Sequence, residues 1–323
     1  MYKVIIVPTD GSGFDREAIR VALRMAERSD AKVRLVRVLA SGSFFGVAAT
    51  AEGTAVAAEV VRSERDRALS ELYALAAECR VTSKADISVD LYAGPVADVL
   101  EGYARRNEVD LIVISTHGRS GISRLSLGSV TDSLIRHTTI PVLVVKPPTS
   151  YLNPQVREAF KRIVVPLDGS TLAEQILPRV LTLAKLEDAE ITLLHVLTSE
   201  SYSQKEIVDP NLPWWDKDIS LAQEYLFRIA GRLRRNGVPA TTDIVISENV
   251  ANAIGDFAGR EKADLIAIAT HGRGGLARML RGSVADAVMH STRMSMLVFK
   301  PDKLAEQEAS PFADGVRADL IPA

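Results

Sequence analysis

Hydrophobic positions along this chain follow two alternating periods. Short runs rich in β-branched residues, such as those at 33–39 and 86–92, have the length and composition of buried strands. Longer amphipathic runs lie between them, and the run at 15–29 places Ile19 and Leu23 at helical spacing. In order, the first half is expected to contain a strand within 3–12, a helix at 15–29, a strand at 33–39, a helix at 64–79, a strand at 86–92, a further helix, a strand at 110–115, a helix opened by Gly128, and a strand at 141–147. This order predicts a parallel sheet covered by helices on both faces.

The second half of the chain repeats this order. The stretch KVIIVPTDGS at 3–12 reappears as RIVVPLDGS at 162–170. The elements expected after it are a helix at 171–187, a strand at 191–197, a helix at 219–236, a strand at 241–246, a further helix, and strands within 264–269 and 295–301. We therefore expect an α/β protein of two tandem doubly wound domains, each a five-stranded parallel sheet of Rossmann-like form. The expected boundaries are a first domain at 1–147, a linker at 148–160, a second domain at 161–301 and a C-terminal tail at 302–323.

One stretch is repeated more closely than the rest. STHGRSGISRLSLGSV at 115–130 and ATHGRGGLARMLRGSV at 269–284 share nine of sixteen positions. The stretch follows the fourth strand of each half, where a doubly wound sheet places its ligand. Its glycines let the backbone approach an oxyanion, and a helix that begins near Ser129 offers N–H groups to it. A turn and a helix cap kept by duplication would also explain the glycines. Identity is concentrated in this loop while the helix surfaces differ, which favours a phosphate site.

Composition and charge narrow the setting and the ligand class. The 323 residues carry 39 basic and 41 acidic side chains, so there is no broad basic field for nucleic acid or an anionic membrane. The single cysteine, Cys79, cannot form an internal disulfide, and the start of the chain lacks the pattern of a secretory signal. The apolar runs are far shorter than the ~20 residues of a membrane helix. We expect a cytoplasmic protein that binds small ligands, without nucleic-acid or membrane partners.

Motifs of other nucleotide-binding and catalytic proteins do not fit. GRGGLA at 272–277 matches a dinucleotide fingerprint, but it follows the fourth strand of its half, and the corresponding GRSGIS breaks the pattern. The chain contains no P-loop and no nucleophile elbow, and its five histidines lack metal-ligand spacing. The sequence therefore predicts no catalytic residue and no metal site.

The motifs that do occur resemble those of one family. The order of a strand with P-T-D, then H-V, then T-H-G-x9-G-S-V, then V-L-V-V-K-P resembles the universal stress proteins over both halves, 1–147 and 161–301. Nucleotide-binding members of that family carry G-x2-G-x9-G-S/T. The second and third glycines of this motif match Gly118 and Gly128 in the first half, and the first glycine is replaced by Ser115. The corresponding positions of the second half are Gly272, Gly282 and, in place of the first glycine, Ala269.

The resemblance implies an adenine nucleotide-binding fold, similar to the adenine nucleotide α-hydrolases, with ATP, ADP or AMP as ligand, with or without magnesium. In the first half the implied binding residues are Pro8, Thr9, Asp10, Val38, Ser115, Thr116, His117, Gly118, Arg119, Gly121, Gly128, Ser129 and Val130. In the second half they are Pro166, Leu167, Asp168, Val196, Ala269, Thr270, Gly272, Arg273, Gly275, Gly282, Ser283 and Val284. Helix capping explains Asp10 and Asp168 equally well, and the two valines pack in the core in either case.

The two halves differ near the implied sites. Aligned on the fourth strands, Gly94 falls opposite Glu248, and Leu127 falls opposite Arg281. A glutamate beside the adenine pocket would crowd the base or repel phosphate, so we expect the first half to bind better. In the second half, residues 199–218 are expected as a long loop whose Trp214 and Trp215 cover a site or pack back on the domain.

The resemblance also implies pairing of the two domains through their last strands, with a homodimer as a further level of assembly. It implies a nucleotide-dependent regulator in the stress response with at most weak ATPase activity. Two alternatives stay open at this point. One is an enzyme of the adenine nucleotide α-hydrolase group with slow ATP hydrolysis or adenylyl transfer, and the other is a scaffold with degenerate pockets.

Overall fold

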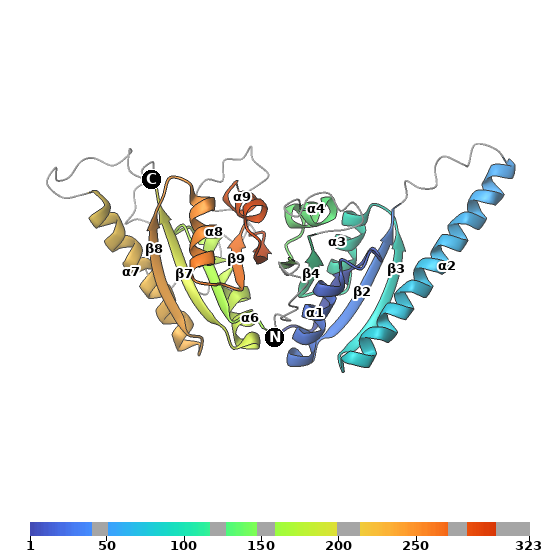
Figure 1. The fold of residues 1–323 in the computed structure, drawn as a ribbon, viewed down its shortest axis with the longest axis horizontal. Coiled ribbons are helices and arrows are strands. Elements are labelled where there is room, and N and C mark those ends of the chain that lie inside the picture. Colours follow the sequence, from blue (N-terminus) through green and yellow to red (C-terminus); the bar gives the residue numbers. More distant parts are fainter. Residues whose placement is uncertain (41–50, 117–126, 147–158, 199–213, 271–282, 302–323) are drawn as a thin grey trace. The chain divides into compact units, whose positions relative to one another are not determined.

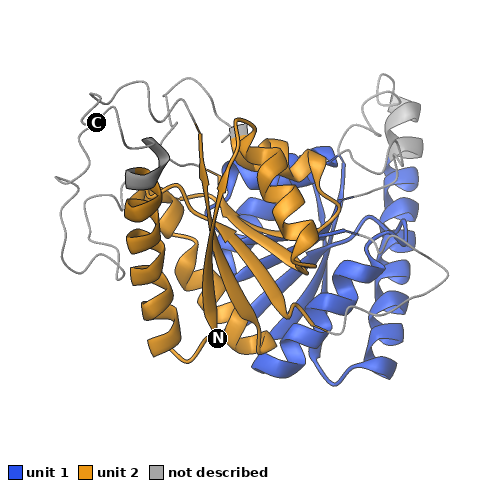
Figure 2. Ribbon diagram, turned by 60° about the vertical axis from the view of Figure 1, so that its left-hand side comes forward, with its two compact units in different colours: residues 1–149 blue, residues 150–323 orange. Residues whose placement is uncertain are grey.

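The computed structural model divides the chain into two compact units, residues 1–149 and 150–323 (Figure 2). The structure describes residues 1–40, 51–116, 127–146, 159–198, 214–270 and 283–301. Most of the expected linker and the whole expected tail lie outside these described residues. Each unit is described by itself.

Unit 1 is a doubly wound α/β sheet (Figure 1). Its strands pair in the order β3-β2-β1-β4-β5, and every pair is parallel. Its elements are β1 (Val4–Pro8), α1 (Arg16–Ser29), β2 (Lys32–Leu39), α2 (Ala51–Thr82), β3 (Asp86–Ala93), α3 (Val96–Arg106), β4 (Leu111–Ser115), α4 (Ser129–His137) and β5 (Val142–Val145). The five parallel strands predicted for the first half are confirmed.

Contacts from one strand show that helices cover both faces of this sheet. In β2, Arg34 donates hydrogen bonds to Tyr103 of α3 and to Asn107 directly after α3, whereas Arg37 donates to Glu71 of α2. Successive side chains of a strand point to opposite faces, so residues 34 and 37 face different sides and α2 and α3 lie on opposite faces. A strand covered on both sides has no polar face, which is why β1 reads as the continuous apolar run of Ile5 to Val7.

Unit 2 repeats the topology, with strands in the order β8-β7-β6-β9-β10, all parallel. Its elements are β6 (Arg162–Pro166), α5 (Thr171–Glu174), α6 (Leu177–Glu187), β7 (Glu190–Leu197), α7 (Trp214–Arg235), β8 (Ala240–Ile246), α8 (Val250–Arg260), β9 (Leu265–Ala269), α9 (Ser283–Ser291) and β10 (Ser295–Phe299). Two tandem doubly wound sheets are therefore the fold of the chain. None of the described helices is long and apolar enough to cross a membrane.

Three expected helix boundaries were wrong. The single helix expected at 171–187 is two helices, because Pro178 lies in the first turn of α6 and cannot donate an N–H to the preceding turn. Helix α2 begins at Ala51 rather than residue 64, and its first turns extend beyond the end of β3 (Figure 1). Helix α7 begins at Trp214, inside the segment expected as a loop. Residues 58–63 of α2 are exposed although Ala58, Val60 and Val61 are apolar, so no buried stripe marks this part of the helix.

Candidate functional site

Two loops meet at the carboxyl edge of unit 1, where the strand order reverses. Strands β1 and β4 are neighbours, and Ile5 lies beside Leu111. Four residues further along each strand, Thr9 and Ser115 therefore reach the same level at the carboxyl edge. This junction between adjacent strands that continue to opposite sides of the sheet is the position at which open α/β sheets bind ligands.

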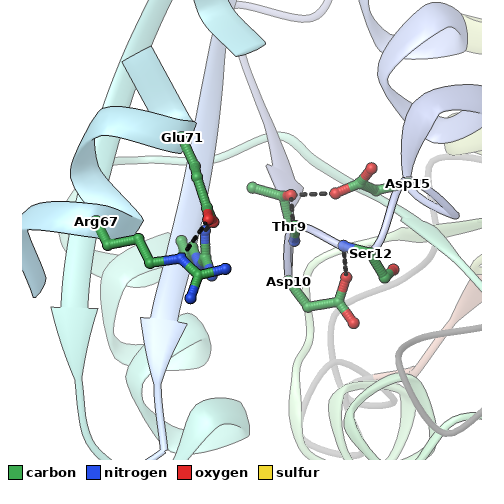
Figure 3. Close-up of polar contacts among 8 residues, drawn as sticks. Thr9, Asp10, Ser12, Asp15, Arg67 and Glu71 are labelled. Carbon is green, nitrogen blue, oxygen red and sulfur yellow. Dashed lines mark hydrogen bonds and ion pairs between the residues drawn. The ribbon is translucent and has the colours of Figure 1, made fainter. Parts of the chain in front are cut away.

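The first loop, residues 9–12, follows β1 and is shaped by its own side chains (Figure 3). The Asp10 carboxylate accepts the backbone N–H of Ser12 at 2.8 Å, and the Thr9 hydroxyl donates to the carboxylate of Asp15. Helix α1 begins at Arg16, with Asp15 as its N-cap residue. Helix capping by Asp10 is therefore excluded. Its carboxylate closes a tight turn and stays at the edge of the sheet.

Asp15 is an unusual part of this loop because it is a carboxylate with 4% of its surface exposed. Burial raises its pKa above the usual range of an aspartate, and the hydrogen bond from Thr9 acts in the opposite direction. Aligning Asp10 with Asp168 places Leu167 opposite Thr9 and Ala173 opposite Asp15, and both of these residues are buried. Unit 2 thus has an apolar pair where unit 1 has a buried polar pair.

The second loop enters helix α4. The N–H of Gly128 donates to the carbonyl of Thr116 at 3.1 Å, and the Thr131 hydroxyl donates to the carbonyl of Ser115 at 3.3 Å. A Cβ atom at Gly128 would lie 3.3 Å from the Thr116 carbonyl oxygen, which is tight. Gly128 is the N-cap residue of α4 and supplies no side-chain cap, while Ser129 is exposed. The first N–H groups of α4 are thus available to an anion at this edge of the sheet.

Strand β2 brings Val38 to the same edge, half-buried and one residue before the strand ends at Leu39. The connection after β3 corrects one expectation. The N–H of Gly94 donates to Leu39, and the N–H of Ser247 donates to Leu197, the residue that aligns with Leu39. Ser247, not Glu248, therefore stands opposite Gly94. Glu248 is exposed one residue further on, so the argument that it crowds a base fails.

Unit 2 assembles its counterparts in the same way. Asp168 accepts hydrogen bonds from the N–H and the hydroxyl of Ser170, and Ser170 caps α5 by accepting from the N–H of Ala173. Asp168 itself is therefore not the helix cap. The remaining described counterparts lie at the ends of their strands or at the start of α9, and they are Pro166, Leu167, Val196, Ala269, Thr270, Ser283 and Val284.

A half-buried carboxyl group lies near the first loop of unit 2. Burial raises the pKa of Glu174, while the nearby Tyr225 hydroxyl and the charges of Arg228 and Arg232 act in the opposite direction. Burial raises the pKa of Tyr225 well above the usual range of a tyrosine, and the charges of Glu174 and Asp168 add to this effect.

Several predicted site residues lie outside the described residues. They are His117, Gly118, Arg119, Gly121, Gly272, Arg273, Gly275 and Gly282, and Arg281 lies there as well.

The structure also adds a residue that the sequence reasoning missed. Arg37 in β2 has 8% of its side chain exposed, and its guanidinium group lies against Gly11 of the first loop. The signal was present in the sequence, because an arginine interrupts an apolar strand directly before Val38.

Comparisons with known proteins agree with the two-domain fold. Residues 1–146 and 159–300 match the Universal stress protein family. The chain is 35% identical over 149 residues to universal stress protein MJ0531 of Methanocaldococcus jannaschii, which covers 46% of this chain and 84% of that protein. It is 27% identical over 259 residues to universal stress protein Rv2005c of Mycobacterium tuberculosis, which covers 79% of each chain. The crystal structure of a universal stress protein from Archaeoglobus fulgidus covers 93% of this chain and 97% of its own, with a TM-score of 0.60 and 18% identity, and supports the fold.

Proposed function

This chain belongs to the universal stress protein family, with a family domain in each half, and from that premise we propose that it binds an adenine nucleotide and acts as a nucleotide-dependent regulator in the stress response. Proteins of this family often bind adenine nucleotides. The ligand we propose is ATP, ADP or AMP, with or without magnesium, and no catalytic role is assigned to any residue.

The observation that carries the proposal is the junction of the two loops in unit 1. Thr9 and Ser115 reach the same level on adjacent strands, and α4 begins beside them without a capping side chain. Gly128 has no side chain, so no side-chain atoms of its own occupy the start of the helix. A Cβ atom there would lie 3.3 Å from the Thr116 carbonyl oxygen. These features suit a phosphate group, because backbone N–H groups and the positive end of the helix dipole both favour an anion.

The nucleoside part of the ligand would contact the first loop and β2. The Asp10 carboxylate accepts one N–H in the loop, and a carboxylate has enough lone pairs to accept a ribose hydroxyl as well. Backbone groups near Val38 would recognise the edge of adenine. Because Glu248 no longer distinguishes the halves, the preference we propose for unit 1 rests on the first loop and its support.

The test is to replace Gly128 by valine and measure nucleotide binding by calorimetry. We expect Gly128→Val to abolish binding in unit 1, because its side chain would collide with the Thr116 carbonyl and fill the space before α4. Gly255→Val is the matched control, because a Cβ atom at this position of α8 meets nothing within 4 Å. Unchanged affinity in the Gly128 variant would refute the phosphate assignment. Mass spectrometry of molecules released from the denatured wild-type protein identifies the ligand.

Assembly stays a prediction. Pairing of the two halves through β5 and β10 is the arrangement we propose, with association of two chains as a further level. Analytical ultracentrifugation with and without ATP measures the number of chains in the assembly.

A further inference from the structure

Arg37 is a buried cation that forms an ion pair with Glu71. Its Nη1 atom donates to Oε2 of Glu71 at 2.7 Å, across from β2 to α2. The other carboxylate oxygen of Glu71 accepts from Nε of Arg67 at 2.9 Å (Figure 3). The hydrogen bonds from Arg37 and Arg67 lower the pKa of Glu71, so this carboxylate stays ionised at neutral pH and compensates the buried guanidinium.

The guanidinium group of Arg37 packs against the first loop. A Cβ atom built on Gly11 would lie 3.1 Å from Nη1, 3.3 Å from Cζ and 3.4 Å from Nη2 of Arg37. All three atoms are close, so the guanidinium group borders the loop directly between Asp10 and Ser12. Gly11 also has a φ of +77°, a conformation that favours glycine. Backbone conformation therefore favours glycine here, and any side chain would also press on the guanidinium group of Arg37.

Unit 2 supports its first loop differently. The strand alignment VRLVRVL with ITLLHVL places His195 opposite Arg37, and Nδ1 of His195 donates to the Leu167 carbonyl at 2.7 Å. The buried positions Ala68, Leu72 and Ala76 of α2 match Ala222, Leu226 and Ala230 of α7. The same offset places Tyr225 opposite Glu71. Both members of the ion pair have therefore changed together, and the aspartate turn that they support occurs in both halves.

We propose that Arg37 is a positioning residue of the unit 1 nucleotide site. Glu71 holds it from α2, and its guanidinium group fixes the loop that presents Asp10 to the ligand. This inference rests on the proposed function where it concerns affinity, whereas its effect on the loop is independent of any ligand. Because unit 2 lacks this ion pair, Arg37 also distinguishes the two sites of the chain.

The test uses hydrogen exchange of the loop and ATP calorimetry on the full-length chain. Arg37→Met removes the guanidinium group and keeps much of the apolar stem. Arg34→Met is the matched control, because Arg34 lies in the same strand and makes two hydrogen bonds on the opposite face. A second pair approaches the contact from the loop. Gly11→Ala and Gly13→Ala impose similar strain, since φ is +77° and +79°, but a Cβ atom at Gly13 meets nothing within 4 Å.

In the ligand-free protein we expect Arg37→Met and Gly11→Ala to speed exchange of the Ser12 amide, and both to weaken ATP binding about tenfold, the equivalent of one lost contact of moderate strength. The Arg34 and Gly13 controls should change each quantity less than about twofold. Combining Arg37→Met with Gly11→Ala should add nothing to the larger single effect, since both changes disturb the same contact between the guanidinium group and the loop.

Three outcomes separate the two proposals. The positioning role is overturned if the exchange rate of the Ser12 amide is unchanged in Arg37→Met. It is also overturned if Arg34→Met changes that rate by the same amount. Absence of ATP binding in the wild-type protein overturns the proposed function, while the exchange measurement still decides the role of Arg37. If Arg37→Met does not fold, the Gly11 and Gly13 pair decides, and equal behaviour of that pair refutes the contact.

Discussion

The ion pair between Arg37 and Glu71 predicts an asymmetry along a single helix. Glu71 and Glu78 lie two turns apart on α2, and each accepts a hydrogen bond from an arginine. The side chains of Arg16 and Glu78 are 61% and 57% exposed, whereas those of Arg37 and Glu71 are 8% and 40% exposed. Solvent screens the first pair and reaches the second from one side only. Replacing either glutamate by glutamine keeps the shape and removes the charge.

The magnitude follows from these exposures. Exposed pairs contribute about 0–1 kcal/mol, so Glu78→Gln should cost about 0.5 kcal/mol or less. Breaking a fully buried pair costs about 3–5 kcal/mol, because a charge is left without its partner. Glu71 is partly solvated and glutamine can still accept from Arg37, which lowers this figure. We expect Glu71→Gln to destabilise unit 1 by about 2 kcal/mol, since a hydrogen bond to a charged group contributes about 1 kcal/mol more than a neutral one and the Arg67 pair is lost as well.

Native-state hydrogen exchange measures this loss in unit 1 alone, for example at the Thr9 amide, which donates to Val36 at 2.9 Å. The pH dependence gives a second signature. The pKa of Glu71 is lowered in the folded protein, so its contribution is present above the unfolded pKa and is lost as the pH falls through the folded pKa. The difference between wild type and Glu71→Gln should therefore shrink on acidification. Equal effects of the two glutamine variants at neutral pH would refute the reasoning.

Two further predictions concern the surroundings of the first loop. Burial raises the pKa of Asp15, so its ionisation opposes folding at neutral pH, and wild-type stability should rise as the pH falls through the folded pKa. Asp15→Asn should remove this pH dependence of stability. If stability measured by hydrogen exchange still depends on pH in the same way in Asp15→Asn, the assignment to Asp15 is contradicted. Gly94→Ala should lower the free energy of unfolding by about 1–3 kcal/mol, because φ is +145° and the new Cβ atom would lie 2.9 Å from Val99 Cγ2. Gly237→Ala is the control, with a φ of +81° and no atom within 4 Å of its Cβ, and it should cost less in chemical denaturation. An equal loss of stability in both variants would show that the contact with Val99 is harmless.

Sequence patterns predicted the strands well and the helix boundaries less well, for identifiable reasons. The central strands are short apolar runs buried on both faces, a pattern that depends on neighbouring residues only. The start of α2 was missed because residues 58–63 are all exposed, and no buried stripe marks the helix there. The break before α6 could have been predicted, since Pro178 interrupts the periodic run.

In the candidate site, too, local features were predicted from the sequence and long-range contacts were not. The turns at Asp10 and Asp168 lie where the strand ends and glycines placed them, because a turn is a local structure. The pairing of Arg37 with Glu71 joins residues 34 positions apart and depends on how α2 lies over β2, which no local pattern specifies. The position of Glu248 was misjudged for a related reason. Unit 2 has one more residue than unit 1 between the third strand and the next helix, and an alignment without that insertion shifts the connection.

The two supports of the first loop in unit 1 respond to pH in opposite directions. Acidification protonates Glu71 and weakens the ion pair that holds Arg37 from α2. It also protonates Asp15 and removes the cost of burying that charge beside α1, and the pKa of Asp15 is raised, so this happens first as the pH falls. Between the folded pKa values of the two groups, the loop therefore passes through a pH range in which Asp15 is neutral and the ion pair is intact. Unit 2 has Ala173, His195 and Tyr225 at the corresponding positions, so neither Asp15 nor Glu71 has a carboxylate counterpart there. A duplicated fold has thus kept the turn that presents its aspartate, while the charges that hold the turn have come to differ between the halves.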